Sequence, residues 1–503
     1  MQSLLASHEA GCRFQRGRVP ERTRCAAQVA EQPLPTEAST SVRARLVCLT
    51  TRGAESKYVL PSQYGGAQVS WSDALPHLCN RVQWTEPSFR AQCFVVDDDL
   101  LTHECSEAIE DADMVVGVGI TDGETAAVIA AASAACPCVV AFDCAAPMSR
   151  AARLHFQPTS VLLGGLSSAL PWSRANRDAL LLESVTQLVA RNLPSDFVFA
   201  LLLLVDSAVA PVQTFTMTQK TGLGNVACML RNCGSEVVAC VTDPQCKAAL
   251  DCLTECGLND QVCSYRCIVS HETPLFEQFS LCNLQKHNCL GNHAERPLLP
   301  AIAPMRSFRG QALTHDVAER LLIGWLDSTD SSLLTDADGP RTPWSWQVVA
   351  GQNPAFDYFP CQNQIFYRAK GNAMWYDPVF KVQTLAGDWE WRRRHYRVKR
   401  GSEPGRFVFS VLDNGVTSLE HWAVVDVADD MSWALFAYSG AAAAAGQAYG
   451  GAVFVTQTGA WPSAEHLSRV EAAHQACGIQ MWETYTVDNS SELCSGAPLH
   501  LPL

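Results

Sequence analysis

Apolar residues in the first half of the chain fall into short runs separated by helical stretches. Thr121–Ala135 is an alanine-rich helical stretch, and Asp178–Arg191 carries leucine and valine on one helical face. Short apolar runs bounded by polar residues are typical of buried strands. Five such strands are predicted, at Arg45–Thr50, Cys93–Asp97, Met114–Ile120, Cys138–Phe142 and Ser160–Leu163. Strand and helix in alternation predict a parallel α/β sheet over residues 45–212.

The pattern changes to short β segments from Trp344 onward. Turn residues separate the segments, at 370–372, 386–388, 401–405, 413–415 and 429–430. Eight strands are predicted, at about 344–351, 361–369, 373–383, 388–399, 405–412, 418–426, 431–439 and 449–457. Such strands with hairpin-length turns predict an up-and-down β-barrel over residues 344–460, which can hold one small apolar ligand. A helix at 464–476 and a tail are predicted for residues 461–503.

A cysteine-rich segment and a linker separate these two regions. Ten of the 22 cysteines lie between residues 228 and 289, which marks 226–290 as a region with its own construction. Residues 291–343 are predicted to be a linker whose first part is extended by Pro297, Pro300 and Pro304. Thr314 is expected to cap a short helix, and residues 327–343 are expected to form a flexible entry to the barrel.

The N-terminal segment and one apolar run bear on targeting. The first 45 residues carry arginine without lysine and a cluster of Ser and Thr, so residues 1–44 are predicted to be an organelle transit peptide. A disordered tail is the alternative, because four glutamates are also present. Phe197–Val205 is shorter than the ~20 residues that span a bilayer. It is interpreted as a buried helix segment, with an export signal ending at Ala208–Ala210 as the alternative.

The net charge and the spacing of three glycines argue against two classes of function, nucleic-acid binding and dinucleotide binding. The net charge of −14 argues against a general nucleic-acid binder, which would carry a basic field. Gly117, Gly119 and Gly123 could place backbone N–H groups against a phosphate, but their spacing differs from the dinucleotide fingerprint. A tight strand-to-helix turn is the favoured interpretation.

Cysteine spacing predicts that residues 226–290 form a small helical domain. Two thiols four residues apart lie on one helix face, and two such helices run antiparallel here. Cys252–Cys267 and Cys256–Cys263 can then close as two rungs. A similar nesting places Cys233–Cys240 inside Cys228–Cys246, and Cys282–Cys289 closes a small loop. Spacing alone does not fix the connectivity.

Metal binding is the competing interpretation of these thiols. Zinc modules favour C-x₂-C knuckles, and the window has none. Disulfides are therefore favoured over zinc, and no metal is predicted. Stable disulfides imply an oxidising compartment.

Motifs in two regions of the chain are specific enough to compare with known families. The cysteine-rich motifs are Cys228-Met-Leu-Arg-Asn-Cys233, Cys252-Leu-Thr-Glu-Cys256 and Cys282-Asn-Leu-Gln-Lys-His-Asn-Cys289. The barrel motifs are Trp346-Gln-Val-Val-Ala-Gly-Gln-Asn-Pro-Ala-Phe-Asp357, Cys361-Gln362 and Tyr449-Gly-Gly-Ala-Val453. These motifs resemble the violaxanthin de-epoxidase family, and most closely its branch called violaxanthin de-epoxidase-related. Arg392–Arg400, Phe409–Gly415 and the α/β region before the cysteines resemble the related branch. The resemblance covers about residues 226–498.

The resemblance implies a fold, a reaction and a location. It implies a lipocalin-like barrel, a chloroplast protein of the thylakoid lumen or thylakoid surface, and a bridge Cys361–Cys494. It implies ascorbate as co-substrate and a xanthophyll whose epoxide oxygen is removed. Arg392–Arg400 is expected to be the solvent face of a barrel strand, with attraction to thylakoid lipid as the alternative.

Candidate site residues come from the same resemblance. Asp357, Gln362 and Tyr438 match or lie near polar residues of the family's barrel mouth. Glu420-His421 replaces a pair of aspartates; Glu420 could act as an acid and His421 could share its proton, with a solvated edge pair as the alternative. Other acids and histidines of the family are replaced, by Pro360, Gln364, Tyr367 and Gln447.

Two functions are predicted from this combination of matched and replaced site residues. The first is an ascorbate-dependent de-epoxidase, because carboxylates with raised pKa in an apolar barrel suit the protonation of an epoxide. The second is a non-catalytic lipocalin that binds a carotenoid or another apolar polyene.

Overall fold

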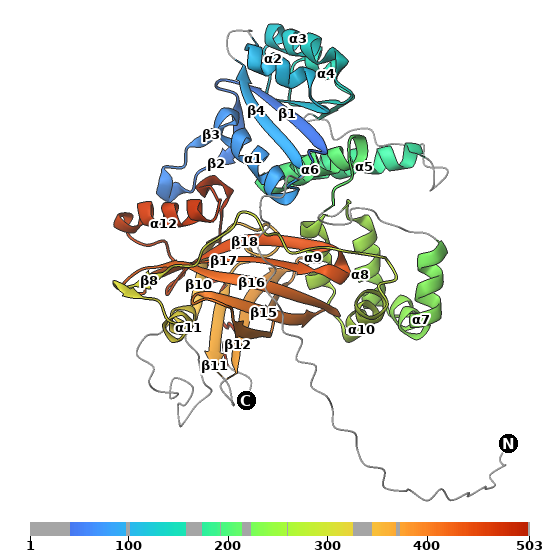
Figure 1. The fold of residues 1–503 in the computed structure, drawn as a ribbon. Coiled ribbons are helices and arrows are strands. Elements are labelled where there is room, and N and C mark those ends of the chain that lie inside the picture. The colour runs from blue at the N-terminus through green and yellow to red at the C-terminus, as the bar shows by residue number, and fades with distance from the viewer. Residues whose placement is uncertain are drawn as a thin grey trace, which may run out of the picture. The chain divides into compact units, whose positions relative to one another are not determined.

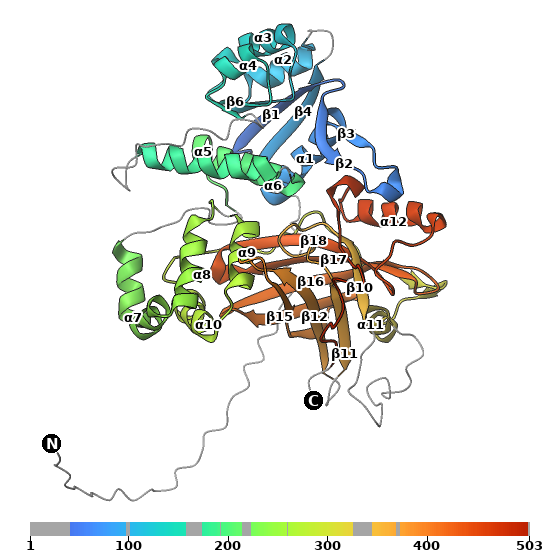
Figure 2. The same ribbon diagram turned by 180° about the vertical axis from the view of Figure 1, so that it is seen from behind.

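The computed structural model describes residues 41–96, 101–156, 174–191, 193–213, 223–258, 260–324, 345–368 and 373–500. Figure 1 and, from behind, Figure 2 show these segments as coloured ribbons. Nearly all of the predicted transit peptide, the predicted strand Ser160–Leu163, the turn 370–372 and the segment 327–343 lie outside the described residues. Among the described helices, none is long and apolar enough to cross a bilayer.

The first region is a parallel sheet covered on both faces. Its strands lie in the order β4-β1-β5-β6-β7, and all pairs are parallel. The strands are β1 (Ala44–Thr51), β4 (Phe89–Val96), β5 (Met114–Val118), β6 (Val139–Phe142) and β7 (Leu154–Phe156). One face packs against α1 (Trp71–Thr85) and α6 (Pro194–Ala208), and α5 (Arg174–Arg191) joins this cluster. The other face packs against α2 (His103–Glu110), α3 (Gly123–Ala132) and α4 (Ala146–Ala151). The predicted α/β sheet is confirmed.

Two open interpretations in this region are decided by burial and capping. Phe197–Val205 lies within α6, and most of its side chains are buried in the core of the sheet, so it is a core helix and not an export signal. The turn after β5 is tight, with Gly119 at φ +64°. The N-terminus of α3 is capped by the Asp122 carboxylate, which accepts a hydrogen bond from the Thr125 N–H at 2.7 Å. This local cap favours the turn interpretation over a phosphate site.

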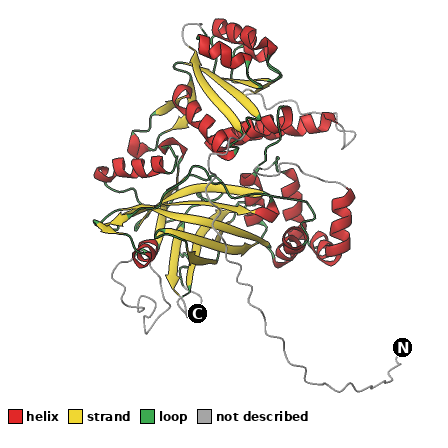
Figure 3. Ribbon diagram, viewed as in Figure 1, coloured by secondary structure: helices red, strands yellow, loops and turns green. Residues whose placement is uncertain are grey.

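The second region is a closed antiparallel barrel. Strands pair in the cycle β11-β10-β18-β17-β16-β15-β14-β12, and β12 pairs back with β11. The eight strands are β10 (Trp346–Gly351), β11 (Asn363–Arg368), β12 (Met374–Gln383), β14 (Tyr396–Arg400), β15 (Arg406–Asp413), β16 (Val416–Val427), β17 (Trp433–Ala442) and β18 (Gln447–Thr456). Figure 3 shows this barrel in yellow. The predicted eight-stranded barrel is confirmed.

One predicted strand is interrupted. Residues 388–399 form β13 (Trp389–Arg393) and β14 (Tyr396–Arg400), and both pair with β12. The register places Arg394 opposite Pro378 in the gap between them. The Arg394 N–H still donates to the Pro378 carbonyl at 3.1 Å, but proline has no N–H to return a bond, so the ladder is interrupted there. The Arg394 side chain lies on the same face as Tyr396 and lines a cavity instead of facing solvent.

The cysteine-rich region is helical, as predicted. Its helices are α7 (Leu223–Thr242), α8 (Pro244–Glu255), α9 (Gln261–Ser270) and α10 (Pro274–Ser280), followed by a π-helical turn, η3 (Leu281–Lys286). All ten of its cysteines form disulfides. Two bridges, Cys252–Cys267 and Cys256–Cys263, are the predicted rungs between α8 and α9.

The other three bridges of this region correct the prediction. The structure has Cys228–Cys289, Cys233–Cys282 and Cys240–Cys246, in place of Cys228–Cys246, Cys233–Cys240 and Cys282–Cys289. Cys233 and Cys240 both lie on α7, where seven residues separate Cα atoms by about 10 Å, too far for a bridge. The first two bridges instead tie α7 to the segment around η3. These cysteines are close in space but far apart in sequence, so their local spacing was misleading.

The predicted linker is partly docked on the barrel. Thr314 caps α11 (His315–Ile323), as expected. Leu321 and Leu322 are buried against the barrel, and the indole N–H of Trp346 donates to the Leu322 carbonyl at 3.1 Å. Residues 305–323 therefore belong to the barrel's packing.

The C-terminal tail is fixed at two points. Cys494 is bridged to Cys361 next to β11, the pair implied by the resemblance. After α12 (Ala464–Ala476), the buried carboxylate of Glu483 accepts hydrogen bonds from Arg81 at 2.6 Å and from His77 at 2.7 Å. These contacts link the tail to α1 of the parallel sheet.

The corrected disulfides give a direct test. Proteolytic mapping without reductant is expected to link the Cys228 peptide to the Cys289 peptide, and the Cys233 peptide to the Cys282 peptide. The Cys252–Cys267 and Cys256–Cys263 rungs serve as internal controls. A peptide containing a Cys282–Cys289 bridge would contradict the fold of α7 against η3.

Candidate functional site

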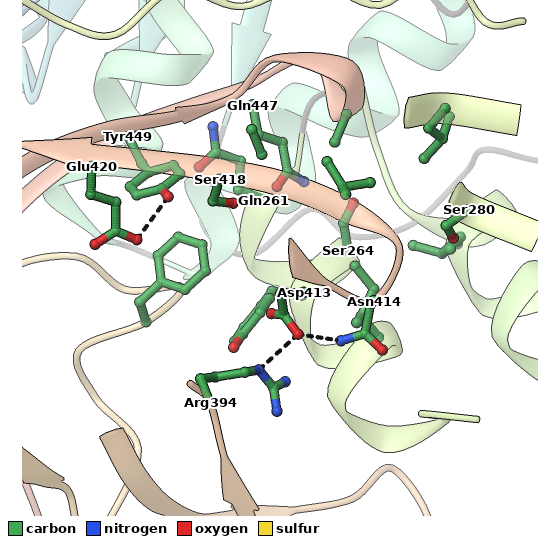
Figure 4. A pocket seen from close by; sticks show the side chains of 18 of the residues that line it. Gln261, Ser264, Ser280, Arg394, Asp413, Asn414, Ser418, Glu420, Gln447 and Tyr449 are labelled. Atoms are coloured by element: carbon green, nitrogen blue, oxygen red, sulfur yellow. Dashed lines mark hydrogen bonds and ion pairs between the residues drawn. The ribbon is translucent and has the colours of Figure 1, made fainter. Parts of the chain in front are cut away.

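A cavity of about 760 Å³ is shared by the barrel and the cysteine-rich helices. Its barrel side carries three carboxyl groups, of which Asp413 is paired with Arg394 and the other two, Asp357 and Glu420, lie among aromatic and amide side chains. Figure 4 shows Glu420 and Tyr449 on one side of this cavity and Arg394 with Asp413 on another. This concentration of buried ionisable groups makes the cavity the candidate active site.

Asp357 lies in the turn that follows β10. One carboxylate oxygen accepts backbone N–H groups of Asn353 at 2.7 Å and Gln352 at 3.1 Å. The other accepts the Tyr438 hydroxyl at 2.7 Å. Burial raises the pKa of Asp357 to about 7, although these hydrogen bonds to the carboxylate oppose the shift. The Asp357 carboxyl group therefore titrates near neutral pH.

Two glycines create the space that Asp357 occupies. A Cβ on Gly351 would lie 2.2 Å from the Asp357 Cβ. A Cβ on Gly451, from β18, would lie 2.8 Å from the Tyr438 hydroxyl and 3.1 Å from an Asp357 oxygen. Residues 351 of β10 and 451 of β18 must therefore lack a side chain for the Asp357–Tyr438 pair to form.

Glu420 is held on β16 by donors from its own strand and from β18. Its oxygens accept the Trp422 indole N–H at 2.7 Å and the Tyr449 hydroxyl at 2.9 Å. Burial raises the pKa of Glu420, and these donors moderate the shift. A Cβ on Gly440 of β17 would lie 2.8 Å from the Glu420 Cγ, so a third glycine makes room for an acid.

The predicted Glu420–His421 partnership is wrong. Successive side chains of a strand point to opposite faces. Among the residues that the structure describes on β16, the cavity is lined by Val416, Ser418, Glu420 and Trp422, and His421 lies on the other face. Glu420 is 6% exposed, so the solvated edge pair is excluded for this acid too.

The remaining predicted polar residues join the site. The Gln362 side-chain amide donates to the Asp357 carbonyl at 2.6 Å, which fixes the turn that carries the acid. Gln364 and Gln447 also line the cavity. Gln364 accepts a hydrogen bond from the Tyr376 hydroxyl. The structure thus brings together Asp357, Gln362, Glu420 and Tyr438, and leaves out His421.

The basic strand Arg392–Arg400 carries several cations that are paired within the protein. Arg392 and Arg394 both pair with Glu272, and Arg394 also pairs with Asp413 at 2.9 Å. Arg393 binds Asp377, and Arg400 binds Glu319 and Asp316. Four of its arginines are therefore held by internal ion pairs, which differs from the predicted solvent face.

Several site residues were missed at the level of sequence. Tyr449 and Trp422 hold Glu420, and Gly351, Gly440 and Gly451 clear the space for both acids. A signal for Trp422 was present, because it lies two residues from Glu420 and must share its face. Contacts between different strands, such as Tyr449 with Glu420, depend on a register that one sequence does not reveal.

Replacing Gly351 tests the close packing around Asp357. Gly351→Ala is expected to lower the free energy of unfolding by about 1–3 kcal/mol, because the new methyl group overlaps Asp357. Gly123→Ala is the matched control, since an added Cβ meets nothing within 4 Å there. Denaturant unfolding of both variants is the measurement. Equal effects at the two sites would contradict the packing described.

The raised pKa of Asp357 predicts how stability depends on pH. Because its folded pKa of about 7 exceeds the ordinary value of 3.8, its protonated form favours folding. That contribution is complete below about pH 4 and is lost as pH rises through about 7, at about 1.4 kcal/mol per pH unit between the two values. Asp357→Asn is expected to flatten the stability profile over this range. The exposed Asp388→Asn is the control, and an unchanged profile in Asp357→Asn would refute the shift.

Comparison with known proteins finds similar chains among both sequences and solved structures. Violaxanthin de-epoxidase, chloroplastic, from Arabidopsis thaliana is 22% identical over 280 residues, 53% of each chain. The same-named protein from Nicotiana tabacum is 21% identical over 276 residues, 53% of this chain and 51% of the relative. The chain thus spans about half the length of these relatives. Among solved structures, lobster apocrustacyanin A1 is 11% identical with a TM-score of 0.24, covering 40% of this chain and 96% of that one.

A match to a family model shows which family the chain belongs to. The model described as VDE lipocalin domain matches residues 225–489, which include the cysteine-rich helices, the barrel and both buried acids. This match extends over more than half of the 503 residues. The chain therefore belongs to the VDE lipocalin domain family.

Proposed function

We propose that this protein is an ascorbate-dependent de-epoxidase of epoxy-xanthophylls. The observation that carries the proposal is the pair of buried acids, Asp357 and Glu420, which face one cavity and both have raised pKa values. Enzymes use burial to keep a carboxylic acid protonated near its working pH, so that it can donate a proton. Membership of the family and the names of its relatives supply the substrate class.

The reaction needs two protons and two electrons. The epoxide takes up both, its two C–O bonds are replaced by a carbon–carbon double bond, and its oxygen leaves as water. One proton is needed as the first C–O bond breaks, and a second is needed for the oxygen to leave as water. Ascorbate supplies the electrons when bound and becomes dehydroascorbate.

The two acids suit two different proton transfers. Glu420 is assigned the first, because its carboxyl group lies at the cavity wall between Trp422 and Tyr449. Asp357 is assigned the second, through the Tyr438 hydroxyl that it holds at 2.7 Å. Gln362 is a positioning residue, since it binds the Asp357 backbone carbonyl.

Neutral hydrogen-bonding side chains in the same cavity suit a polyhydroxylated reductant. Gln364, Tyr376 and Gln447 line the cavity and carry amide or hydroxyl groups that pair with hydroxyl groups. These residues would hold ascorbate beside the acids.

A chloroplast location accompanies the proposal. The relatives are named chloroplastic, and residues 1–44 have the composition of a transit peptide. Six disulfides favour an oxidising space such as the thylakoid lumen over a reducing stroma. Contact with thylakoid lipid would bring the protein to its apolar substrate.

A second function, non-catalytic carotenoid binding, is favoured by one observation. Gln364 and Gln447 line the cavity with uncharged amides, at positions where the sequence resemblance implies ionisable residues in the family. With fewer titratable groups, the cavity has fewer sites through which acid could switch it. Under this alternative the protein binds an epoxy-xanthophyll and does not convert it.

Substitution of Glu420 separates the two functions. Pigment analysis after incubation with violaxanthin, ascorbate and thylakoid lipid is expected to show loss of epoxide by the unmodified protein, faster as pH falls below about 7. Glu420→Gln is expected to reduce the rate about 10²–10³-fold, as for loss of a general acid. His421→Gln is the matched control, expected to stay within about threefold because its side chain lies on the other face of β16. Bound pigment without epoxide loss at any pH would establish the alternative.

A further inference from the structure

Helices outside the barrel build the apolar part of the cavity. Leu253 from α8, Ile268 from α9, and Phe276 and Phe279 from α10 line it. Leu253, Ile268 and Phe279 are only half-buried, although they belong to the apolar cluster of the helical region. Their remaining apolar surface is therefore available to a ligand.

The barrel side of the same cavity carries its carboxyl groups and most of its tyrosines. It presents Asp357, Glu420, Gln364 and a ring of tyrosines, all of which carry polar atoms. Gln261 and Ser264 of α9 and Ser280 of α10 add polar groups on the helix side (Figure 4), but the carboxyl groups of the cavity lie on the barrel side and Leu253, Ile268 and Phe279 on the helix side. A ligand that matches both sides has an oxygen-bearing head and a hydrocarbon chain.

The helices are held on the barrel by specific contacts. The guanidinium of Arg392 donates to the Val269 carbonyl at 3.0 Å, which ties the end of α9 to β13. Gln261 donates to the Ala448 carbonyl at 2.8 Å, and the Thr417 N–H donates to the Gln285 side chain at 2.8 Å. These contacts tie α9 and η3 to the barrel rim, so the lining side chains keep a defined place over its mouth.

Close packing at one hairpin also fixes the helices on the barrel. Gly415, in the turn between β15 and β16, approaches α10 so closely that a Cβ there would lie 2.2 Å from the Glu277 carbonyl oxygen. Nearby, Arg394 joins the two parts from the cavity wall, pairing with Glu272 before α10 and with Asp413 at 2.9 Å (Figure 4).

We infer that the disulfide-bonded helices form the outer half of the ligand site and select ligands by the length of their hydrocarbon chain. The ligand class is an elongated amphiphile whose oxygenated ring enters the barrel while its chain lies along Leu253, Ile268 and Phe279. This inference rests on the proposed function for the identity of the head group. It adds that residues outside the barrel determine which substrates are accepted.

Binding of two probes tests the inference without requiring turnover. The long probe is violaxanthin, and the short probe is 5,6-epoxy-β-ionone, which shares the epoxide ring but lacks the long chain. Quenching of protein tryptophan fluorescence reports both, because Trp422 lines the cavity. Leu253→Trp, which narrows the outer half, is expected to weaken binding of the long probe at least about tenfold and to change binding of the short probe less than about twofold.

Control variants keep the outcome interpretable. Val238→Trp, on α7, is the matched control, because that side chain is 57% exposed and does not line the cavity; it is expected to bind both probes normally. Ile268→Ala provides a second perturbation that removes a contact with the chain, and retained binding of the short probe shows that each variant is folded. Equal changes for both probes, or full affinity of Leu253→Trp for the long probe, would overturn the inference alone. If the unmodified protein bound neither probe, the proposed ligand class would fail, and this inference with it.

Discussion

Asp357 and Glu420 are removed from water inside a barrel whose other lining groups are mostly aromatic or amide side chains. Desolvation of a carboxylate disfavours its charged form, and here it outweighs the opposing hydrogen bonds from Tyr438, Tyr449, Trp422 and two backbone amides. Much of the surrounding structure serves this burial. Glycines in β10, β17 and β18 make room for the acids and their partners, and barrel closure leaves the ladder around them without an open edge.

The cysteine-rich helices also keep the two acids away from water. A barrel mouth open to solvent would hydrate the two acids and lower their pKa values. The helices cover that mouth, and five disulfides hold them together in a region too small to depend on a large core of its own. The disulfide-bonded helices and the acidic site thus depend on each other, and the family model includes both.

Much of the fold could be predicted from local patterns. Strands of both sheets follow from short apolar runs and turn residues, and the rungs of α8 and α9 follow from thiols four residues apart. The prediction failed where distant segments meet: Cys228 and Cys233 pair with residues near η3, and Pro378 interrupts the neighbouring strand at Arg394. Asp357, Gln362 and Tyr438 were found through resemblance, not through spacing. Strand alternation alone could have separated His421 from Glu420, whereas Tyr449 and the three glycines depend on strand register.

Infrared spectroscopy of the carboxyl groups tests the central claim most directly. Protonated carboxylic acids have a C=O stretch distinct from that of carboxylates, and ordinary Asp and Glu are largely ionised above about pH 5. A protonated carboxyl band that persists above this pH, titrates near pH 7 and is absent from Asp357→Asn is expected, together with a band absent from Glu420→Gln that titrates at a higher pH than an ordinary glutamate. A spectrum in which all carboxyl groups ionise below about pH 5 would contradict the claim.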